Sequence, residues 1–422
     1  MKKTPLRVYT LIVCLALPFF SRADDALLGR TVESLLEFAR ASNAETAAMR
    51  LEAVAADERI LPAGALPDPM LRTEFRDMTR MGEQKATLAP SRVGSTRYLL
   101  MQTLPWYGKR ALKEDLARFD AEVARSRADG AWIEIAARIK AAHVQRYTLD
   151  RVVRLAREEL DLMSRLEKIA RERYAVGLAA QQDVIHAQLE QTAIRSELIQ
   201  MENEGRQIQT RVNALLSRPA GAPLAAPERL RALPAPAKLE YAALEERTRE
   251  RNPELFAEEA RIRAAEKQRE LTYKDRYPDF TLGVSPIQYQ HAVREWEVMV
   301  EFNIPLQQSS RRAKEREAES MLGAARLRKE AASHRLLAEL AENLSGIEAA
   351  RHAESLVVSS LLPQAESTFL AALAAYETAK VDFSTLLEAQ RQIRQARQSR
   401  LKAQAESLIR LAEVEKILGD DL

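Results

Sequence analysis

The chain carries one succession of motifs twice, and this duplication constrains its fold more than any other feature of the sequence. Asn43-Ala44-Glu45 returns as Asn252-Pro253-Glu254, and all later matches keep the same order in both copies. Those later matches are Leu66-Pro67-Asp68-Pro69 with Tyr277-Pro278-Asp279-Phe280, Thr103-Leu104-Pro105 with Asn303-Ile304-Pro305, Lys109-Arg110 with Arg311-Arg312, Tyr174 to Gly177 with Tyr376 to Ala379, and Ala187-Gln188 with Ala389-Gln390. Self-similarity at a long, nearly constant spacing predicts two copies of one structural unit.

The motif positions divide the chain into four parts. Residues 24–216 make the first repeat, with a β-hairpin predicted at 70–104, and residues 238–422 make the second, with a hairpin at 279–304. Between them, residues 217–237 hold five of the 17 prolines, a composition typical of a linker.

Residues 1–23 have the layout of a secretory signal peptide. Lys2, Lys3 and Arg7 precede an apolar run at 8–20, and Ala23 supplies a small residue at the expected cleavage site. The run is too short to span a bilayer comfortably, so we expect an exported chain without a helical anchor. Cys14, the only cysteine, lies inside the run. Lipidation of Cys14 remains an alternative, although Val13 stands where a lipidation signal has a small residue.

Most of each repeat has the sequence of long amphipathic helices. Apolar residues recur every three or four positions, and the chain has only 13 glycines. The pattern predicts helices at 25–62, 110–173 and 180–216 in the first repeat, and at 237–275, 311–374 and 381–418 in the second. Pro363 should kink the long helix of the second repeat. The predicted fold is therefore mainly α, with long antiparallel coiled-coil helices and a small antiparallel β part.

Four short segments instead alternate with the period of a β-strand. They lie at 70–78, 96–104, 280–285 and 295–304. In the last segment Trp296, Val298 and Val300 alternate with Glu297 and Glu301. Ten of the 23 aromatic residues (10 Phe, 10 Tyr and 3 Trp) fall near these segments, as in the aromatic girdles of transmembrane β-barrels. The alternation alone leaves an ordinary soluble sheet as an alternative.

One chain has too few such strands to close a barrel. In lipid, the open edges of a four-stranded sheet would leave backbone groups unpaired, at several kcal/mol each. Closed barrels begin at about eight strands. Two chains would give a solid barrel of eight strands and three would give a channel of twelve, so membrane-spanning strands predict an oligomer. Glu297, Glu301 and Asn303 are predicted to face its lumen.

Several classes of function find no support in the sequence. The net charge of +3 comes from 64 basic and 61 acidic residues that are interleaved, whereas a nucleic-acid surface needs a patch of one sign. The five histidines show no metal-binding spacing; His186, three residues after Asp183, forms the one pair on a helix face, and a solvated polar pair is its simpler reading. We therefore predict no catalytic residue, no metal site and no cofactor.

Four motifs, in order, resemble the TolC-like outer membrane factors, and most closely their CzcC/CusC-like heavy-metal branch. They are Leu66-Pro67-Asp68-Pro69, the run from Gln102 to Arg110 (QTLPWYGKR), the run from Arg173 to Leu178 (RYAVGL) with Gln182-Asp183-Val184, and Tyr376 with the run Leu386 to Ala389. The resemblance covers essentially the whole mature chain. It implies a homotrimer with a 12-stranded barrel in the outer membrane of a Gram-negative bacterium and a periplasmic α-helical barrel. It also implies a periplasmic adaptor (membrane fusion) protein and an inner-membrane pump, of RND type in the heavy-metal branch.

In that family the helix breaks form the periplasmic tip, which holds the gate and contacts the adaptor. Carried over by position, the resemblance assigns two sets of residues to the tip: Tyr174, Val176, Gly177, Leu178 and Asp183 from the first repeat, and Tyr376, Ala379, Lys380 and Glu388 from the second. The second repeat departs from the pattern, with Ala379 in place of glycine and Thr385 at the position of Asp183. Asp183 can equally be interpreted as a carboxylate that stabilises the N-terminus of a helix. Tyr174 and Tyr376 can equally be interpreted as residues that pack in the seam between two helices.

The sequence thus predicts a passive, gated outer-membrane duct for efflux, with heavy-metal cations as the expected cargo. A drug-efflux or type I secretion channel is the alternative within the class, because the same duct serves cargo selected upstream. A soluble periplasmic coiled-coil scaffold is the alternative from another class.

Overall fold

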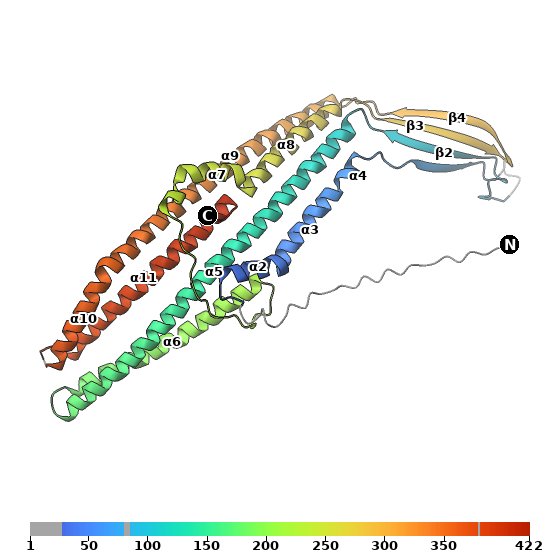
Figure 1. Ribbon diagram of the computed structural model, residues 1–422. Coiled ribbons are helices and arrows are strands. Elements are labelled where there is room, and N and C mark those ends of the chain that lie inside the picture. Colours follow the sequence, from blue (N-terminus) through green and yellow to red (C-terminus); the bar gives the residue numbers. More distant parts are fainter. Residues whose placement is uncertain (1–27, 80–84, 379) are drawn as a thin grey trace, which may run out of the picture. The chain divides into compact units, whose positions relative to one another are not determined.

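The computed structural model describes residues 28–79, 85–378 and 380–422 (Figure 1). The predicted signal peptide, with Cys14, and Ala379 lie outside the described residues. The described chain is mainly helical with one four-stranded antiparallel sheet, as predicted. It divides into two compact units, Met1–Ala39 with Ala142–Arg231 and Arg40–Ala141 with Ala232–Leu422. The second unit thus combines part of the first repeat with the second repeat.

The predicted helices at 25–62 and 237–275 are each broken at the repeated asparagine. The first gives α2 (Val32–Ser42), α3 (Ala44–Glu58) and a short α4 (Ile60–Gly64), and the second gives α7 (Tyr241–Arg251) and α8 (Pro253–Lys274). Asn43 accepts a hydrogen bond from the backbone N–H of Thr46 (2.8 Å), and Asn252 accepts from Glu254 (2.8 Å) and Leu255 (3.1 Å). An N-cap residue has a non-helical backbone, so the repeated Asn motif starts a new helix in both copies.

The long helices agree with the predicted ranges within a few residues. They are α5 (Lys109–Ala175), α6 (Gln181–Leu215), α9 (Gln308–Leu356), α10 (Leu362–Glu377) and α11 (Phe383–Leu418). In the second unit α8 lies beside α9, and α10 lies beside α11 (Figure 1). Where α5 meets α8, the seam buries the small and branched apolar side chains of Val123, Ala257 and Ala260. Seams of this kind are the predicted coiled-coil packing.

The predicted disturbance at Pro363 takes the form of a π-helical turn, Val357–Leu361, between α9 and α10. Proline has no N–H to donate, and its ring clashes with the carbonyl group four residues earlier, here that of Ser359. The wider π-turn displaces that carbonyl, and the helix resumes with Pro363 in its first turn.

The Pro-rich linker is ordered by backbone hydrogen bonds within the first unit. The N–H of Ala225 donates to the carbonyl of Leu28 (2.8 Å), and that of Glu228 donates to Arg30 (3.0 Å). Asn213 and Arg146 donate further side-chain hydrogen bonds to linker carbonyls. The linker joins the second repeat through a 3₁₀ turn, Pro236–Leu239.

The sheet consists of β1 (Met70–Arg76), β2 (Ser95–Leu104), β3 (Phe280–Tyr289) and β4 (Ala292–Phe302), in that order and antiparallel throughout. Pairing of β2 with β3 joins the hairpins of the two repeats, and β1 and β4 form the edges (Figure 1). The third strand was predicted only as far as Ser285, and the next residue, Pro286, is of a type that is uncommon inside a central strand. In the structure β3 continues through Pro286 to Tyr289, and the register with β4 shifts between Ile287 and Gln288.

Candidate channel wall and helix tips

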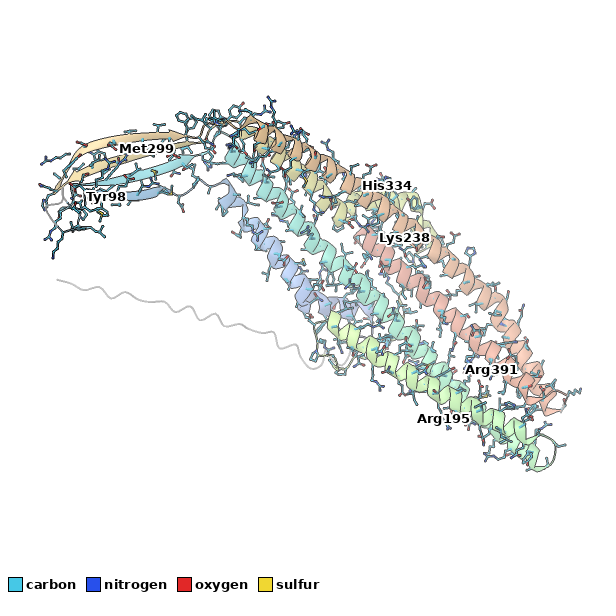
Figure 2. All side chains as sticks on the ribbon, turned by 180° about the vertical axis from the view of Figure 1, so that it is seen from behind. Tyr98, Arg195, Lys238, Met299, His334 and Arg391 are labelled. Atoms are coloured by element: carbon cyan, nitrogen blue, oxygen red, sulfur yellow. The ribbon has the colours of Figure 1, made fainter. Side chains whose placement is uncertain are left out.

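The register gives the sheet one apolar face and one charged face. The apolar face carries Leu71, Phe75, Tyr98, Leu100, Phe280, Leu282, Val284, Trp296, Val298, Val300 and Phe302. The opposite face carries Arg72, Glu74, Arg97, Thr103, Thr281, Ser285, Glu295, Glu297 and Glu301, together with Leu99 and the methionines at 70, 101 and 299. Side chains project from both faces, with Tyr98 and Met299 on opposite faces (Figure 2).

The apolar face is the exposed one. Val298 is 80% exposed and Trp296 is 70% exposed, whereas Leu99 on the charged face is 2% exposed. A soluble sheet shows the reverse, with its apolar face against a core and its charges in water. Contiguous apolar surface of this kind marks contact with another protein or with lipid.

Arg97 organises the charged face from the middle of β2. Its guanidinium lies 2.8 Å from the carboxylate of Glu297 on β4 and 3.7 Å from that of Glu74 on β1, and its Nε donates to Ser285 Oγ (3.0 Å). Glu297 and Glu301, two of the predicted lumen residues, lie on this face. Asn303 lies just beyond β4, where its side-chain oxygen accepts the backbone N–H of Asp279 (2.7 Å).

The motif QTLPWYGKR forms a junction between the sheet and the helices. The ring of Trp106 stacks on Tyr277 at 4.9 Å, and its backbone N–H donates to Asp279 (2.7 Å). The ammonium group of Lys109, at the start of α5, is buried and lies 3.0 Å from Asp279 and 3.2 Å from Asp275. Gly108 has a φ of +83°, which glycine adopts without steric cost. The end of one repeat's hairpin is thus bound to the start of the other's.

The tip of the first repeat is a Schellman motif, which ends α5. The N–H of Gly177 donates to the carbonyl of Tyr174 (3.0 Å), and that of Leu178 donates to Arg173 (2.8 Å). Gly177 has the left-handed φ of +77° that this motif needs. Val176 and Leu178 project from the turn and are exposed, as is Tyr174. These predicted tip residues therefore share one exposed turn.

Asp183 lies in the first turn of α6, and its backbone N–H donates to the carbonyl of Ala180 (3.1 Å). Its side chain is half-buried. Further from the turn, Glu167 of α5 accepts hydrogen bonds from Gln188 and Gln191 of α6 (both 2.9 Å). These two hydrogen bonds lower the pKa of Glu167, and the bond from Gln188 has the larger effect. Sequence reasoning missed this polar link between the two helices of the first coil.

The second repeat ends α10 with the equivalent hydrogen bond, from the N–H of Lys380 to the carbonyl of Ala375 (2.9 Å). Lys380 and Glu388 are exposed. Tyr376 is buried, and its ring meets that of Phe383 edge to face, with 5.4 Å between the ring centroids. This contact is packing within the seam between α10 and α11.

Asp382 is an acidic residue at the second tip that the alignment of the two repeats missed. It is the N-cap of α11, and its carboxylate accepts from the side chain (2.5 Å) and the backbone N–H (3.0 Å) of Thr385. These hydrogen bonds, the side-chain one first, lower the pKa of Asp382. Aligning Thr385 with Asp183 hid this residue, although an Asp three positions before a Thr is a recognisable capping signal.

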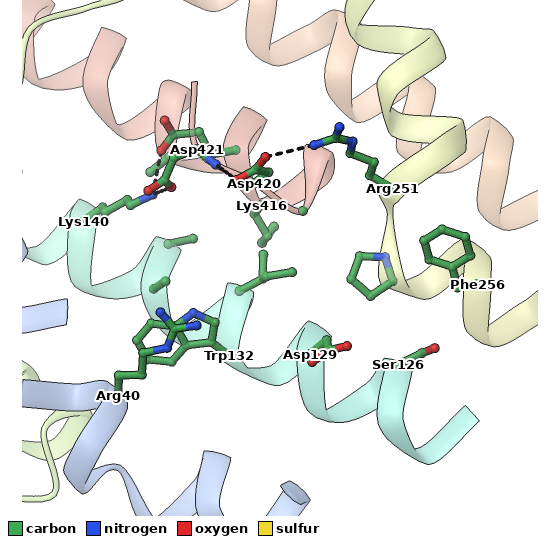
Figure 3. A pocket seen from close by; sticks show the side chains of 17 residues that line it. Arg40, Ser126, Asp129, Trp132, Lys140, Arg251, Phe256, Lys416, Asp420 and Asp421 are labelled. Carbon is green, nitrogen blue, oxygen red and sulfur yellow. Dashed lines mark hydrogen bonds and ion pairs between the residues drawn. The ribbon is translucent and has the colours of Figure 1, made fainter. Parts of the chain in front are cut away.

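A cavity of about 450 Å³ in the second unit is lined by paired charges (Figure 3). Lys140 of α5 lies 2.8 Å from the buried Glu415 of α11 and also pairs with Asp421. Arg251 lies 3.2 Å from Asp420. Each of these cations already has a carboxylate partner, and the ion pairs hold the residues after α11 against α5 and the end of α7.

The described residues contain no group of three or more His, Cys, Asp or Glu side chains placed to hold a metal ion. His186 interacts with Gln182 at 3.1 Å, one turn away on α6. One helical stretch, within Gln308–Glu377, is long and apolar enough to cross a membrane by length and composition. That criterion alone is weak, since core helices of soluble proteins also meet it.

Comparison with known proteins relates part of the chain to one family. Residues 244–420 match the family of outer membrane efflux proteins (OEP). No curated protein matches the chain significantly by sequence. The predicted resemblance to outer membrane efflux proteins is confirmed by the family match, and so is the predicted location in the outer membrane of a Gram-negative bacterium with a large periplasmic part.

Solved structures extend the likeness of the fold to most of the chain. A structure of CusC, described in terms of folding and transmembrane channel formation, has a TM-score of 0.79 at 17% identity and covers 92% of both chains. The outer membrane protein VceC from Vibrio cholerae has a TM-score of 0.79 at 15% identity, over 92% of this chain and 96% of that chain. The outer-membrane channel OprN has a TM-score of 0.77 at 18% identity, over 92% and 89%.

Proposed function

We propose that three copies of this chain form a passive efflux duct, with a twelve-stranded barrel in the outer membrane and a helical tunnel in the periplasm. The observation that carries the proposal is the exposed apolar face of the sheet, which lies opposite a face that carries Arg97, Glu297 and Glu301. Lipid is the partner that suits an apolar face with aromatic residues at its ends. A water-filled lumen suits the face that carries Arg97, Glu297 and Glu301.

The open edges of the sheet support the number of chains. β1 and β4 each have one unpaired side among the described residues, so a sheet in lipid must gain neighbours on both edges. Two chains would fill the barrel with side chains, whereas three leave a channel. A duct therefore needs three.

The tip residues are proposed to gate the duct and to contact a periplasmic adaptor, which connects it to an inner-membrane pump of RND type. In the first repeat Val176 and Leu178 offer an exposed apolar turn suited to docking. Asp183 of each copy would add a negative charge to the constriction, and Lys380, Glu388 and the position of Ala379 would complete the tip from the second repeat. Tyr174 is proposed to hydrogen-bond across to a neighbouring coil, while Tyr376 supports its own coil from inside.

Heavy-metal cations are the proposed cargo. The motif from Gln102 to Arg110 resembles the heavy-metal branch, the fold is similar to that of CusC, and the carboxylates of Glu297, Glu301 and Asp183 favour cations over anions. Drug efflux and type I secretion are the alternatives within the class. If metal cations are the cargo, deletion of the gene should make the host sensitive to metal salts. If the protein serves drug efflux, deletion should make the host sensitive to hydrophobic drugs.

The gate assignment can be tested by single-channel recording in planar bilayers. Asp183→Ala should raise the conductance for monovalent cations at low voltage, or weaken block by multivalent cations, because multivalent cations would no longer bind a ring of carboxylates and obstruct the constriction. Glu204→Ala, an exposed carboxylate further along α6, is the matched control and should change neither. Unchanged conductance and block in Asp183→Ala would remove this residue from the gate, and absence of any channel from wild-type protein would contradict the duct itself.

A further inference from the structure

Within the chain, a junction binds the two repeats to each other beside β2 and β3. The segments before β1 and after β4 could form a second junction of the same kind, but they do not meet within one chain. Inside, the segment after β2 binds the segment before β3: Trp106 stacks on Tyr277, and Lys109 pairs with Asp279. The two contacts combine an apolar pair with a buried ion pair. Together they bind the strands to the helices where the repeats meet.

The duplication gives each of these residues a counterpart at the outer edges of the sheet. In the segment after β4, Leu306 corresponds to Trp106, and the pair Arg311-Arg312 corresponds to Lys109-Arg110. In the segment before β1, Leu66 corresponds to Tyr277 and Asp68 to Asp279. β1 and β4 are the opposite edges of the sheet, so the two counterpart segments do not meet in the order β1-β2-β3-β4.

The counterpart residues are exposed. Leu306 is 79% exposed and Leu66 is 42% exposed, and Asp68 and Arg312 are exposed as well. Arg311, the counterpart of Lys109, is half-buried and donates to the backbone carbonyl of Asp275 (3.4 Å), whereas Arg312 beside it is the exposed cation at this edge. One edge therefore offers an apolar side chain and a cation, and the other offers an apolar side chain and an anion.

We propose that Leu306 and Arg312 of one copy bind Leu66 and Asp68 of a second copy, and so repeat between chains the junction seen within the chain. The occupant of each edge is this same chain, because the complementary half of the junction is its own second edge. Such a contact is heterologous, so it must propagate until a ring closes. The inference rests on the proposed trimer and names the residues that hold its sheet–helix junction.

Directed cross-linking tests the contact. Leu66→Cys and Leu306→Cys, combined in one chain and treated with a short bismaleimide in outer-membrane vesicles, should convert most of the protein to a covalent trimer on a denaturing gel. Either single variant should not form that trimer, and neither should the wild type, which carries only Cys14. Leu66→Cys combined with Trp296→Cys is the matched control, because Trp296 is also highly exposed (70%, against 79% for Leu306) but lies in the first half of β4.

Charge exchange provides a second test that needs no new cysteine. Asp68→Arg and Arg312→Asp should each reduce the fraction of protein that survives as a trimer on mild heating in detergent, and the two changes together should restore it. If the wild type is a trimer, but the double variant Leu66→Cys, Leu306→Cys does not cross-link and charge exchange has no effect, the junction is overturned and the proposed duct still stands. A wild-type protein that is a monomer would overturn both.

Discussion

Among single residues, Gly177 is the one whose backbone the first tip requires. Its left-handed φ of +77° ends α5, and a Cβ at this position would meet no atom within 4 Å. Gly177→Ala should therefore cause no clash, and the strain of alanine at a left-handed φ should lower the free energy of unfolding by about 1 kcal/mol. Urea unfolding followed by circular dichroism measures this change.

Gly323 supplies the control for that substitution. It lies inside α9, is exposed, and its added Cβ would also meet no atom within 4 Å. Gly323→Ala should raise the free energy of unfolding by about 0.5–1 kcal/mol, because alanine favours a helix interior. Equal effects of the two substitutions would show that the conformation of Gly177 does not matter.

His143 should make the first unit sensitive to acid. It is 2% exposed, its Nε2 has no hydrogen-bond partner among the described residues, and burial lowers its pKa against the opposing effect of a hydrogen bond with the backbone of Arg30. The unfolded chain therefore binds a proton more readily than the folded one, so stability falls as the pH drops below the ordinary histidine pKa of about 6.5.

The measurement is the unfolding midpoint in urea between pH 8 and pH 5. His143→Gln should flatten the loss of stability below about pH 6.5, since glutamine does not titrate. His352→Gln is the matched control and should leave the pH profile as it is in the wild type, because the side chain of His352 is exposed. An unaltered profile in His143→Gln would contradict the assignment.

At the scale of elements, the two asparagine caps should differ in their contribution to stability. Asn43→Ala removes the cap of α3 and should cost about 1 kcal/mol. Asn252→Ala removes the cap of α8 and also the hydrogen bond from its Nδ2 to the carbonyl of Ile417 (2.8 Å), so it should cost about 2 kcal/mol or more. Urea unfolding of both variants gives the comparison, and a smaller effect at Asn252 would contradict it.

The elements also show how far the sequence could lead. Apolar periodicity located the long helices and the alternating strands, because both depend on which face is buried. It missed the breaks at Asn43 and Asn252, since a cap leaves the periodicity of the flanking helices almost unchanged. It also ended β3 at Ser285, because the continuation of the strand through Pro286 depends on pairing with β4 and not on local sequence.

Within the candidate site, the division into apolar and charged faces was predictable for β4 and weak for β2. Glu297 and Glu301 alternate strictly with large apolar residues, whereas Leu99 and Met101 share a face with Arg97. The ion pairs of Arg97 join residues distant in sequence, so only the register could reveal them. Asp382 was missed because the repeats were aligned by position and not by capping pattern.

At the scale of the whole molecule, the proposed duct depends on a sheet that can close only by pairing with the strands of neighbouring chains. The part of a single chain that the structure describes offers four strands, two open edges and an exposed apolar face. The same geometry explains why export is expected to precede assembly, since an exposed apolar face of this size would aggregate in water. The helices and the sheet are joined through Trp106 and Lys109, so assembly of the sheet also positions the coils of the second unit.

The most direct test of this claim is the mass of the protein particle extracted from outer membranes in mild detergent, measured by native mass spectrometry. The account predicts three chains in each particle, and dissociation to single chains only after heating. A monodisperse single chain that stays in solution without detergent would contradict it.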